Sequence, residues 1–107
     1  MPAYQMIVLT NAVPGREDEF NRWYDEIHLA DVLKVEGVRA ARRFRAVDSG
    51  AWRYVAIYDL ECEAPNGVME EIVRRWQSGE MRGTEAFDAS NFIMTIVEPV
   101  DLSAATR

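Results

Sequence analysis

The sequence predicts an α+β domain in which strands and helices follow one another in the order βαββαβ, with the four strands forming one antiparallel sheet. Three observations predict it. The chain has 107 residues, enough for a single hydrophobic core. Segments rich in β-forming residues alternate with two segments of helical periodicity. Turn residues separate the two middle strands, as in a hairpin. We assign residues 1–100 to this domain and residues 101–107 to a loose tail.

The first half of the chain contains the stronger helix. A strand is expected over residues 4–10, which are rich in β-forming side chains. A helix should begin near Arg16, because three acidic residues follow it and suit the positive end of a helix dipole. Large apolar side chains then recur at spacings of three and four, at Phe20, Trp23, Tyr24 and Ile27. Gly37 is expected to cap the end of this helical region.

The second half supplies a hairpin, a helix and the last strand. The hairpin strands are predicted at residues 38–47 and 52–61, with the turn residues Asp48, Ser49 and Gly50 between them. A helix beginning near Val68 places apolar residues at helical spacings, and residues 91–97 read as the final strand. The resulting order is the ferredoxin-like arrangement, in which both helices cover one face of the sheet.

Both faces of the predicted sheet are apolar. In the third strand Tyr54 and Tyr58 share one face, while Val55 and Ile57 share the other, and the first and last strands alternate in the same way. Since the helices can cover only one face, a monomer would expose a large apolar patch. We therefore predict a homodimer formed through the uncovered sheet face about a two-fold axis.

Composition and charge exclude several classes of partner and site. The net charge of −6 and a pI near 4.7 oppose binding to nucleic acid or to anionic membranes. Neither a signal peptide nor an apolar run of about 18 residues is apparent, so a cytoplasmic location is expected. Cys62 lies between Glu61 and Glu63, which disfavour its thiolate, and we interpret it as inert. No metal site and no cofactor are predicted.

His28 is the single histidine and the first candidate for catalysis. Imidazole titrates near neutral pH, so it can both accept and donate a proton. Tyr24 precedes it by four residues and would share its helix face, while Asp25 or Asp31 could orient the ring. The alternative is a structural histidine near a helix end, where it interacts with the helix dipole.

Aromatic and basic side chains supply candidate ligand contacts. Trp23, Tyr54, Tyr58 and Trp76 could line a pocket for an aromatic ligand, and their alternative role is core packing. The arginines of the second strand divide by parity, with Arg39, Arg43 and Arg45 on one face and Arg42 on the other. Arg42 could bind a carboxylate or an oxyanion of a substrate. The alternative is that these arginines form a solvated or interface stripe.

Residues 20–38 carry a motif. It consists of the run Phe20-Asn21-x-Trp23-Tyr24-Asp25-Glu26-x-His28-Leu29-x-Asp31-Val32-Leu33, followed by Gly37-Val38. This run resembles the motif of the EthD-like branch of the dimeric α+β barrel superfamily. Glu36 stands where that family usually has a proline before the glycine. The resemblance implies a dimer whose sheets form a shared barrel, with a pocket in each subunit between sheet and helices. It also places His28 on the histidine of the family motif.

Together these features predict a small cofactor-independent enzyme that acts on an aromatic or polyketide-like molecule by proton transfer, with His28 and Tyr24 as catalytic residues. Cyclase, isomerase, dehydratase and lyase reactions are all compatible with such a site. Two alternatives stay open: a cofactor-free monooxygenase, and a non-catalytic ligand-binding or accessory protein. The superfamily hosts all of these activities and also haem enzymes, so the fold does not choose between them.

Overall fold

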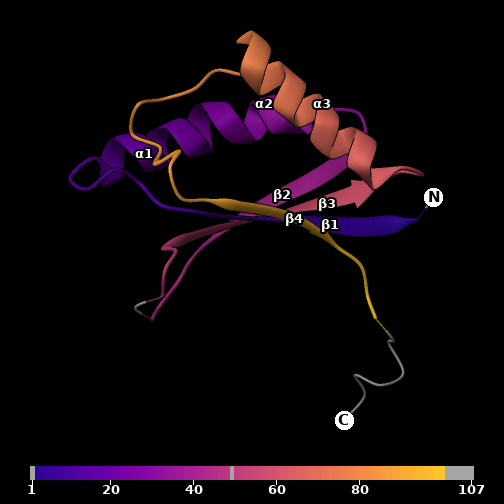
Figure 1. Ribbon diagram of the computed structural model, residues 1–107, viewed down its shortest axis with the longest axis horizontal. Coiled ribbons are helices and arrows are strands. Elements are labelled where there is room, and N and C mark those ends of the chain that lie inside the picture. Colours follow the sequence, from indigo (N-terminus) through magenta and orange to yellow (C-terminus); the bar gives the residue numbers. More distant parts are fainter. Residues whose placement is uncertain (1, 49, 101–107) are drawn as a thin grey trace.

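The computed structural model describes residues 2–48 and 50–100, and the tail predicted at 101–107 lies outside them. The elements along the chain are β1 (Ala3–Thr10), α1 (Glu17–Trp23), a π-helical segment η1 (Tyr24–His28), α2 (Leu29–Leu33), β2 (Val38–Arg45), β3 (Tyr54–Glu61), α3 (Pro65–Ser78) and β4 (Ile93–Val97). The strands form one sheet in the order β2-β3-β1-β4, and every neighbouring pair is antiparallel. All helices lie on one side of this sheet (Figure 1). The predicted ferredoxin-like α+β fold is confirmed.

The core lies between the sheet and the helices. On the helix-facing side of the two central strands, alternate residues are buried: Met6, Val8 and Thr10 of β1, and Tyr54, Ala56, Tyr58 and Leu60 of β3. Phe20 is completely buried and packs against Tyr54, with ring centroids 5.2 Å apart. The apolar stripe of the first helix therefore faces the sheet, as its spacing predicts.

The strands predicted at residues 38–47, 52–61 and 91–97 are each two residues shorter in the structure, and two further boundaries differ for a clear physical reason. Helix α3 begins at Pro65 rather than near Val68, because proline is well suited to the first helical position, where its missing N–H is not needed. Gly37 is not the helix cap, since α2 ends at Leu33 with Lys34 as its C-cap. Gly37 instead adopts a φ of +97° in the turn before β2, where a side chain would approach Val68 to 3.0 Å. A glycine is thus required there for the turn and for the close approach.

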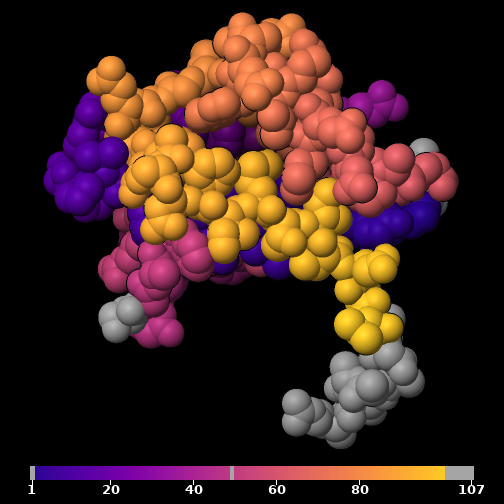
Figure 2. Space-filling model, in the orientation of Figure 1, coloured from indigo at the N-terminus to yellow at the C-terminus, as the bar shows by residue number. Residues whose placement is uncertain are grey.

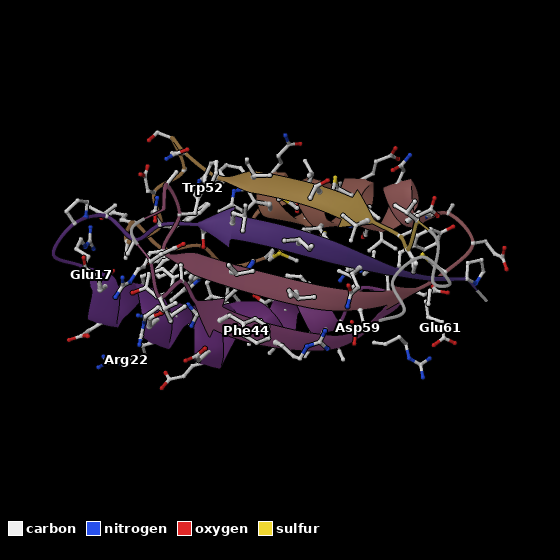
Figure 3. The ribbon with its side chains drawn as sticks, turned by 90° about the horizontal axis from the view of Figure 1, so that it is seen from below. Glu17, Arg22, Phe44, Trp52, Asp59 and Glu61 are labelled. Carbon is white, nitrogen blue, oxygen red and sulfur yellow. The ribbon has the colours of Figure 1, made fainter. Side chains whose placement is uncertain are left out.

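The other face of the sheet carries no helix (Figure 3). Four apolar residues of the central strands point to this side: Ile7, Leu9, Val55 and Ile57. They alternate along each strand with the buried residues that face the helices. Phe44 of β2 is 48% exposed and the outer residues of β4, Ile93 and Val97, are 39% and 37% exposed. The predicted alternation therefore holds, and this uncovered sheet face is largely apolar.

Within residues 2–48 and 50–100, no helix has the length and apolar character needed to cross a membrane.

Candidate functional site

A cavity of about 270 Å³ lies between the sheet and the helices, where the family resemblance implies a pocket. Its sheet side is formed by β1, β3 and β4, and its other walls by the first helical region, α3 and the segment that leads into β4. Figure 2 shows α3 and this segment covering that side of the molecule. Five of the predicted site residues line the cavity: Trp23, Tyr24, His28, Tyr58 and Trp76.

A π-helical turn sets the position of His28. The backbone N–H of Leu29 donates to the carbonyl of Tyr24, five residues earlier, where an α-helix would use a carbonyl four residues earlier. In a regular α-helix, residues five apart point about 140° away from each other. The wider turn brings Trp23 and His28 together instead, so that their rings stack with centroids 4.6 Å apart at 19°. The π-turn therefore turns His28 towards the aromatic cavity.

Aromatic rings surround the imidazole of His28. Besides Trp23, the edges of Tyr24 and Trp76 meet it with centroids 5.0 and 5.8 Å away. The pKa of His28 is lowered to about 4, mainly by this burial; the Asp31 carboxylate partly opposes the shift, and the Arg43 charge adds to it. At neutral pH the imidazole is uncharged, so it has a lone pair that can accept a proton.

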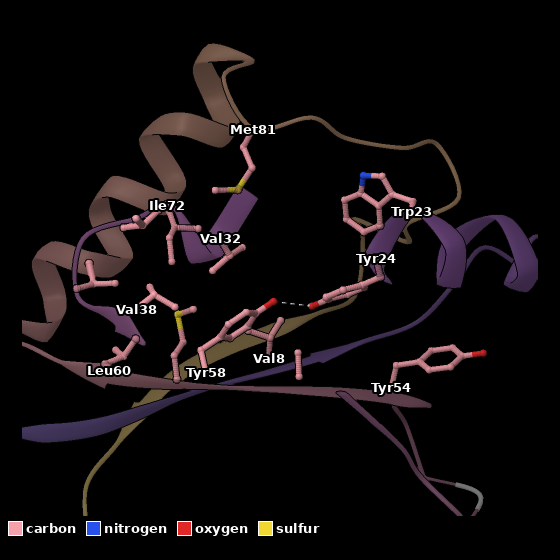
Figure 4. Packing of buried hydrophobic residues seen from close by; sticks show 14 of the residues in the cluster. Val8, Trp23, Tyr24, Val32, Val38, Tyr54, Tyr58, Leu60, Ile72 and Met81 are labelled. Carbon is pink, nitrogen blue, oxygen red and sulfur yellow. Dashed lines mark hydrogen bonds between the residues drawn. The ribbon is translucent and has the colours of Figure 1, made fainter. Parts of the chain in front are cut away.

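Two tyrosine hydroxyls meet at the cavity wall. The Tyr58 hydroxyl donates to that of Tyr24 at 3.4 Å, as Figure 4 shows between the sheet and the first helical region. Burial raises the pKa of both phenols, so both stay protonated at neutral pH. Because the oxygen of Tyr24 accepts this bond, its own hydrogen is free to donate to a ligand oxygen.

Neither aspartate that could orient His28 does so. Asp25 accepts a hydrogen bond from Arg43 at 2.8 Å, and Asp31 is bound by Arg82. The Nδ1 atom of His28 is buried and has no hydrogen-bond partner among the described residues. The sequence interpretation is wrong here because the spacing along a helix shows which side chains are close, and not which more distant partner competes for them.

Two predicted ligand contacts do not reach the cavity. Arg42 points to the uncovered sheet face, where its guanidinium makes two bonds to Asp59, at 2.8 and 3.2 Å. The Tyr54 hydroxyl accepts a hydrogen bond from Asn21 at 3.2 Å, within the core at the other end of β3. Neither residue lines the cavity, so both lie outside the candidate site.

Arg43, unlike Arg42, lies on the helix side of the sheet and contacts Tyr24. Its guanidinium lies 4.3 Å from the ring centre of Tyr24 and donates to Asn21 at 2.7 Å. It does not itself line the cavity. Arg43 therefore supports the face of Tyr24, where a cation over an aromatic ring is favourable.

Several residues that line the cavity were not predicted from the sequence. Thr10 ends β1, while Phe87 and Phe92 come from the segment after α3. Phe87 stacks parallel to Trp23 at 6.3 Å. The helix-face alternation of β1 could have indicated Thr10, but the segment of residues 79–92 has no periodicity from which its contacts could be inferred.

Asp31 holds the segment of residues 79–92 against the first helical region. Its buried carboxylate accepts three hydrogen bonds from Arg82, two from the guanidinium, at 2.8 and 3.2 Å, and one from the backbone N–H, at 3.2 Å. These bonds keep the pKa of Asp31 below its usual value. The indole N–H of Trp23 donates to the Arg82 carbonyl at 3.1 Å. Arg82 thus links the first helical region to the segment that forms part of the cavity wall.

We expect Asp31→Ala to lower the free energy of unfolding by about 2 kcal/mol, because it leaves the Arg82 donors without their partner. Urea denaturation followed by circular dichroism measures this. The matched control is Glu80→Ala, which removes an exposed ion pair with Arg74 and should cost less than about 0.5 kcal/mol. Equal losses in the two variants would contradict the anchoring role of Asp31.

Within the described part of the chain, no three His, Cys, Asp or Glu side chains are grouped so as to hold a metal ion.

Comparison with known proteins identifies the fold of the chain, and it finds no protein of closely similar sequence. No protein-family model matches the chain, and no curated protein matches it. Among solved structures, a candidate antibiotic biosynthesis monooxygenase from Bordetella bronchiseptica superposes with a TM-score of 0.69 at 20% identity, covering 94% of this chain and 99% of that one. An EthD family protein from Bacillus halodurans gives 0.64 at 17% identity, covering 92% and 99%.

A dimeric ferredoxin-like protein of unknown function from Jannaschia is also similar, with a TM-score of 0.58 at 11% identity over 92% of this chain and 100% of that one. Identities this low establish the fold and leave the activity open. The chain therefore has the ferredoxin-like α+β fold that EthD family and dimeric ferredoxin-like proteins share.

Proposed function

We propose that this protein binds an aromatic or polyketide-like small molecule in the cavity and catalyses a proton transfer, with His28 as the acid/base and Tyr24 as a hydrogen-bond donor. The observation that carries the proposal is the uncharged His28 on the wall of an apolar cavity, beside a protonated phenol. A neutral imidazole accepts a proton, and in a buried site a hydrogen bond from Tyr24 to the oxyanion that develops on the ligand is stronger than in water.

The proposed step is an enolisation. His28 removes a proton from a carbon next to a ligand carbonyl, and the C–H electron pair moves into the new carbon–carbon double bond. The carbonyl oxygen gains the negative charge and accepts a hydrogen bond from the Tyr24 hydroxyl, which keeps its proton. The imidazolium then returns the proton to carbon or delivers it to a leaving hydroxyl, so no electron is gained or lost overall. Cyclisation, isomerisation and dehydration can all proceed from this enolate.

Proton transfer can be measured before the natural substrate is known. 2-Tetralone is a neutral bicyclic ketone with acidic protons next to its carbonyl. In D₂O we expect the protein to speed the exchange of these protons for deuterium well above the rate in buffer, as followed by ¹H NMR. Exchange at the buffer rate, with the ketone bound and recovered unchanged, would favour the non-catalytic ligand-binding alternative.

A cofactor-free monooxygenase is the second candidate. Two of the similar structures are described as candidate monooxygenases, and Trp23, Trp76 and Phe87 give the cavity an electron-rich aromatic wall. In this reaction an electron-rich substrate itself reduces oxygen. Oxygen uptake that depends on substrate would favour the monooxygenase, and proton exchange without oxygen uptake would favour the proton-transfer enzyme.

We also propose that two chains pair through the uncovered sheet face. Supporting this are its apolar residues, among them Phe44, Ile93 and Val97, and the similarity to the Jannaschia protein, which is described as dimeric. Burial of such a face against its own copy would remove apolar surface from water on both chains. The cytoplasmic location predicted from the sequence stays a prediction.

A further inference from the structure

The cavity wall carries no charged side chain. Among the described residues that line it there is no Lys, Arg, Asp or Glu. Its polar side chains, apart from the indole N–H groups of the tryptophans, are Thr10, Tyr24, His28, Tyr58 and Gln77. His28 is uncharged at neutral pH because burial depresses its pKa. A ligand that enters the cavity therefore meets no counter-charge.

The two charged groups that act on His28, Arg43 and Asp31, are already paired. The guanidinium of Arg43 donates to Asp25 at 2.8 Å and to Asn21 at 2.7 Å. Asp31 is bound by Arg82, with its shortest bond at 2.8 Å. Recruiting either group to a ligand would break these bonds and leave a charge without its partner, which is costly in a partly buried site.

Two polar atoms of lining residues lack partners. Thr10 is 2% exposed, and its Oγ1, like the Nδ1 of His28, makes no hydrogen bond within the described residues. Thr10 belongs to the helix-facing set of β1 and His28 to the helical region above, so the two groups come from different layers. A buried polar atom without a partner is destabilising, so it calls for a specific explanation, and a role in function is one. Rotation about the Cα–Cβ bond lets the Thr10 hydroxyl turn towards a ligand.

We propose that the cavity takes an uncharged ring compound whose carbonyl oxygen uses its two lone pairs to accept hydrogen bonds from both Tyr24 and Thr10, and that it excludes the corresponding carboxylate. This inference rests on the proposed function and narrows its substrate class. Transfer of such a ligand from water into the cavity costs little free energy, because its rings contact apolar walls and only its one polar group needs a hydrogen-bond partner. A carboxylate would lose its hydration without gaining a cation or a full set of donors.

Two probes of nearly the same shape test the exclusion of charge. 2-Acetylnaphthalene carries a neutral carbonyl group where 2-naphthoate carries a carboxylate. By isothermal titration calorimetry at neutral pH, we expect the ketone to bind and the naphthoate to bind at least about 100-fold more weakly, given the cost of burying an unpaired charge. Naphthoate binding as tight as that of the ketone would overturn the inference and leave the proposed function standing.

Thr10→Val tests the polar contact, because valine keeps the shape and replaces the hydroxyl with a methyl group. We expect the variant to bind 2-acetylnaphthalene about 5-fold more weakly, the worth of one neutral hydrogen bond, and to bind naphthalene as the wild type does. Unchanged ketone affinity would overturn the role of Thr10. If neither the ketone nor naphthalene binds the wild-type protein, both the proposed function and this inference are wrong.

Discussion

His28→Asn is expected to lower the rate of protein-catalysed deuterium exchange into 2-tetralone by at least about 100-fold, the usual contribution of a general base. Asparagine preserves a polar side chain of smaller size on the cavity wall, but it cannot accept a proton at neutral pH. His28 is the single histidine of the chain, so no second imidazole can replace it. NMR measurement of the exchange rate in D₂O provides the test.

Three controls separate catalysis from structure. The circular dichroism spectrum should stay that of the wild type and the ketone should still bind, although the variant loses the ring contacts of His28 with Trp23 and Tyr24 and its melting temperature should fall. Tyr24→Phe should reduce exchange less, by about 10-fold, because one hydrogen-bond donor is lost. Glu80→Ala, on the exposed surface beyond α3, should leave exchange unchanged. Wild-type exchange in the His28→Asn variant would refute the acid/base role.

The pH dependence of exchange provides an independent test of the same residue. The active form is the neutral imidazole, and burial holds the pKa of His28 at about 4 instead of 6.5. The protein-catalysed rate should therefore stay constant as the pH falls through 6.5 and decline only near 4. A decline centred near the ordinary histidine value would show that the imidazole is solvated during the reaction.

Ile57→Lys is expected to separate the proposed dimer, raising its dissociation constant by at least about 100-fold. Ile57 lies on the uncovered sheet face, directly between its strand partners Ile7 and Arg42. A lysine there would add a second positive charge beside Arg42 and would bury it in an apolar interface. Light scattering of the wild type and the variant at micromolar concentration measures the change in mass.

The matched control is Leu33→Lys, which makes the same kind of change on the helix side of the molecule. Leu33 is 42% exposed at the end of α2, so a lysine there can remain in water. This variant should keep the mass of the wild type, and both variants should keep its circular dichroism spectrum. A wild-type protein that is monomeric at micromolar concentration would contradict the pairing of sheet faces.

Part of the candidate site was predictable because it depends on neighbours along one helix. Tyr24 and His28 are four residues apart, and their rings do meet. The stacking of His28 on Trp23, five residues away, was not predictable, because it depends on a π-turn that no residue of the segment requires. The same holds for Asp31, whose partner Arg82 lies 51 residues further along the chain.

The arginines of β2 show a second limit. Strand alternation places Arg42 and Arg43 on opposite faces, and the structure agrees. Alternation does not indicate which face the helices cover, because the strands are apolar on both faces. Arg42 was therefore a reasonable candidate for ligand binding, and only the packing of the helices showed that it lies outside the cavity.

The sequence by itself determined the order of the elements, the two-sided apolar character of the sheet and the scarcity of proton-transfer groups, because these follow from local periodicity and composition. Tertiary structure alone decided which sheet face the helices cover, that no charged side chain lines the cavity among the described residues, and that Asp25 and Asp31 form hydrogen bonds with arginines instead of with His28. The physical reason is that side chains compete for partners throughout the fold. The residue that pairs with a charge, or the helix that covers a sheet face, can be distant in the chain, and local sequence patterns do not show it.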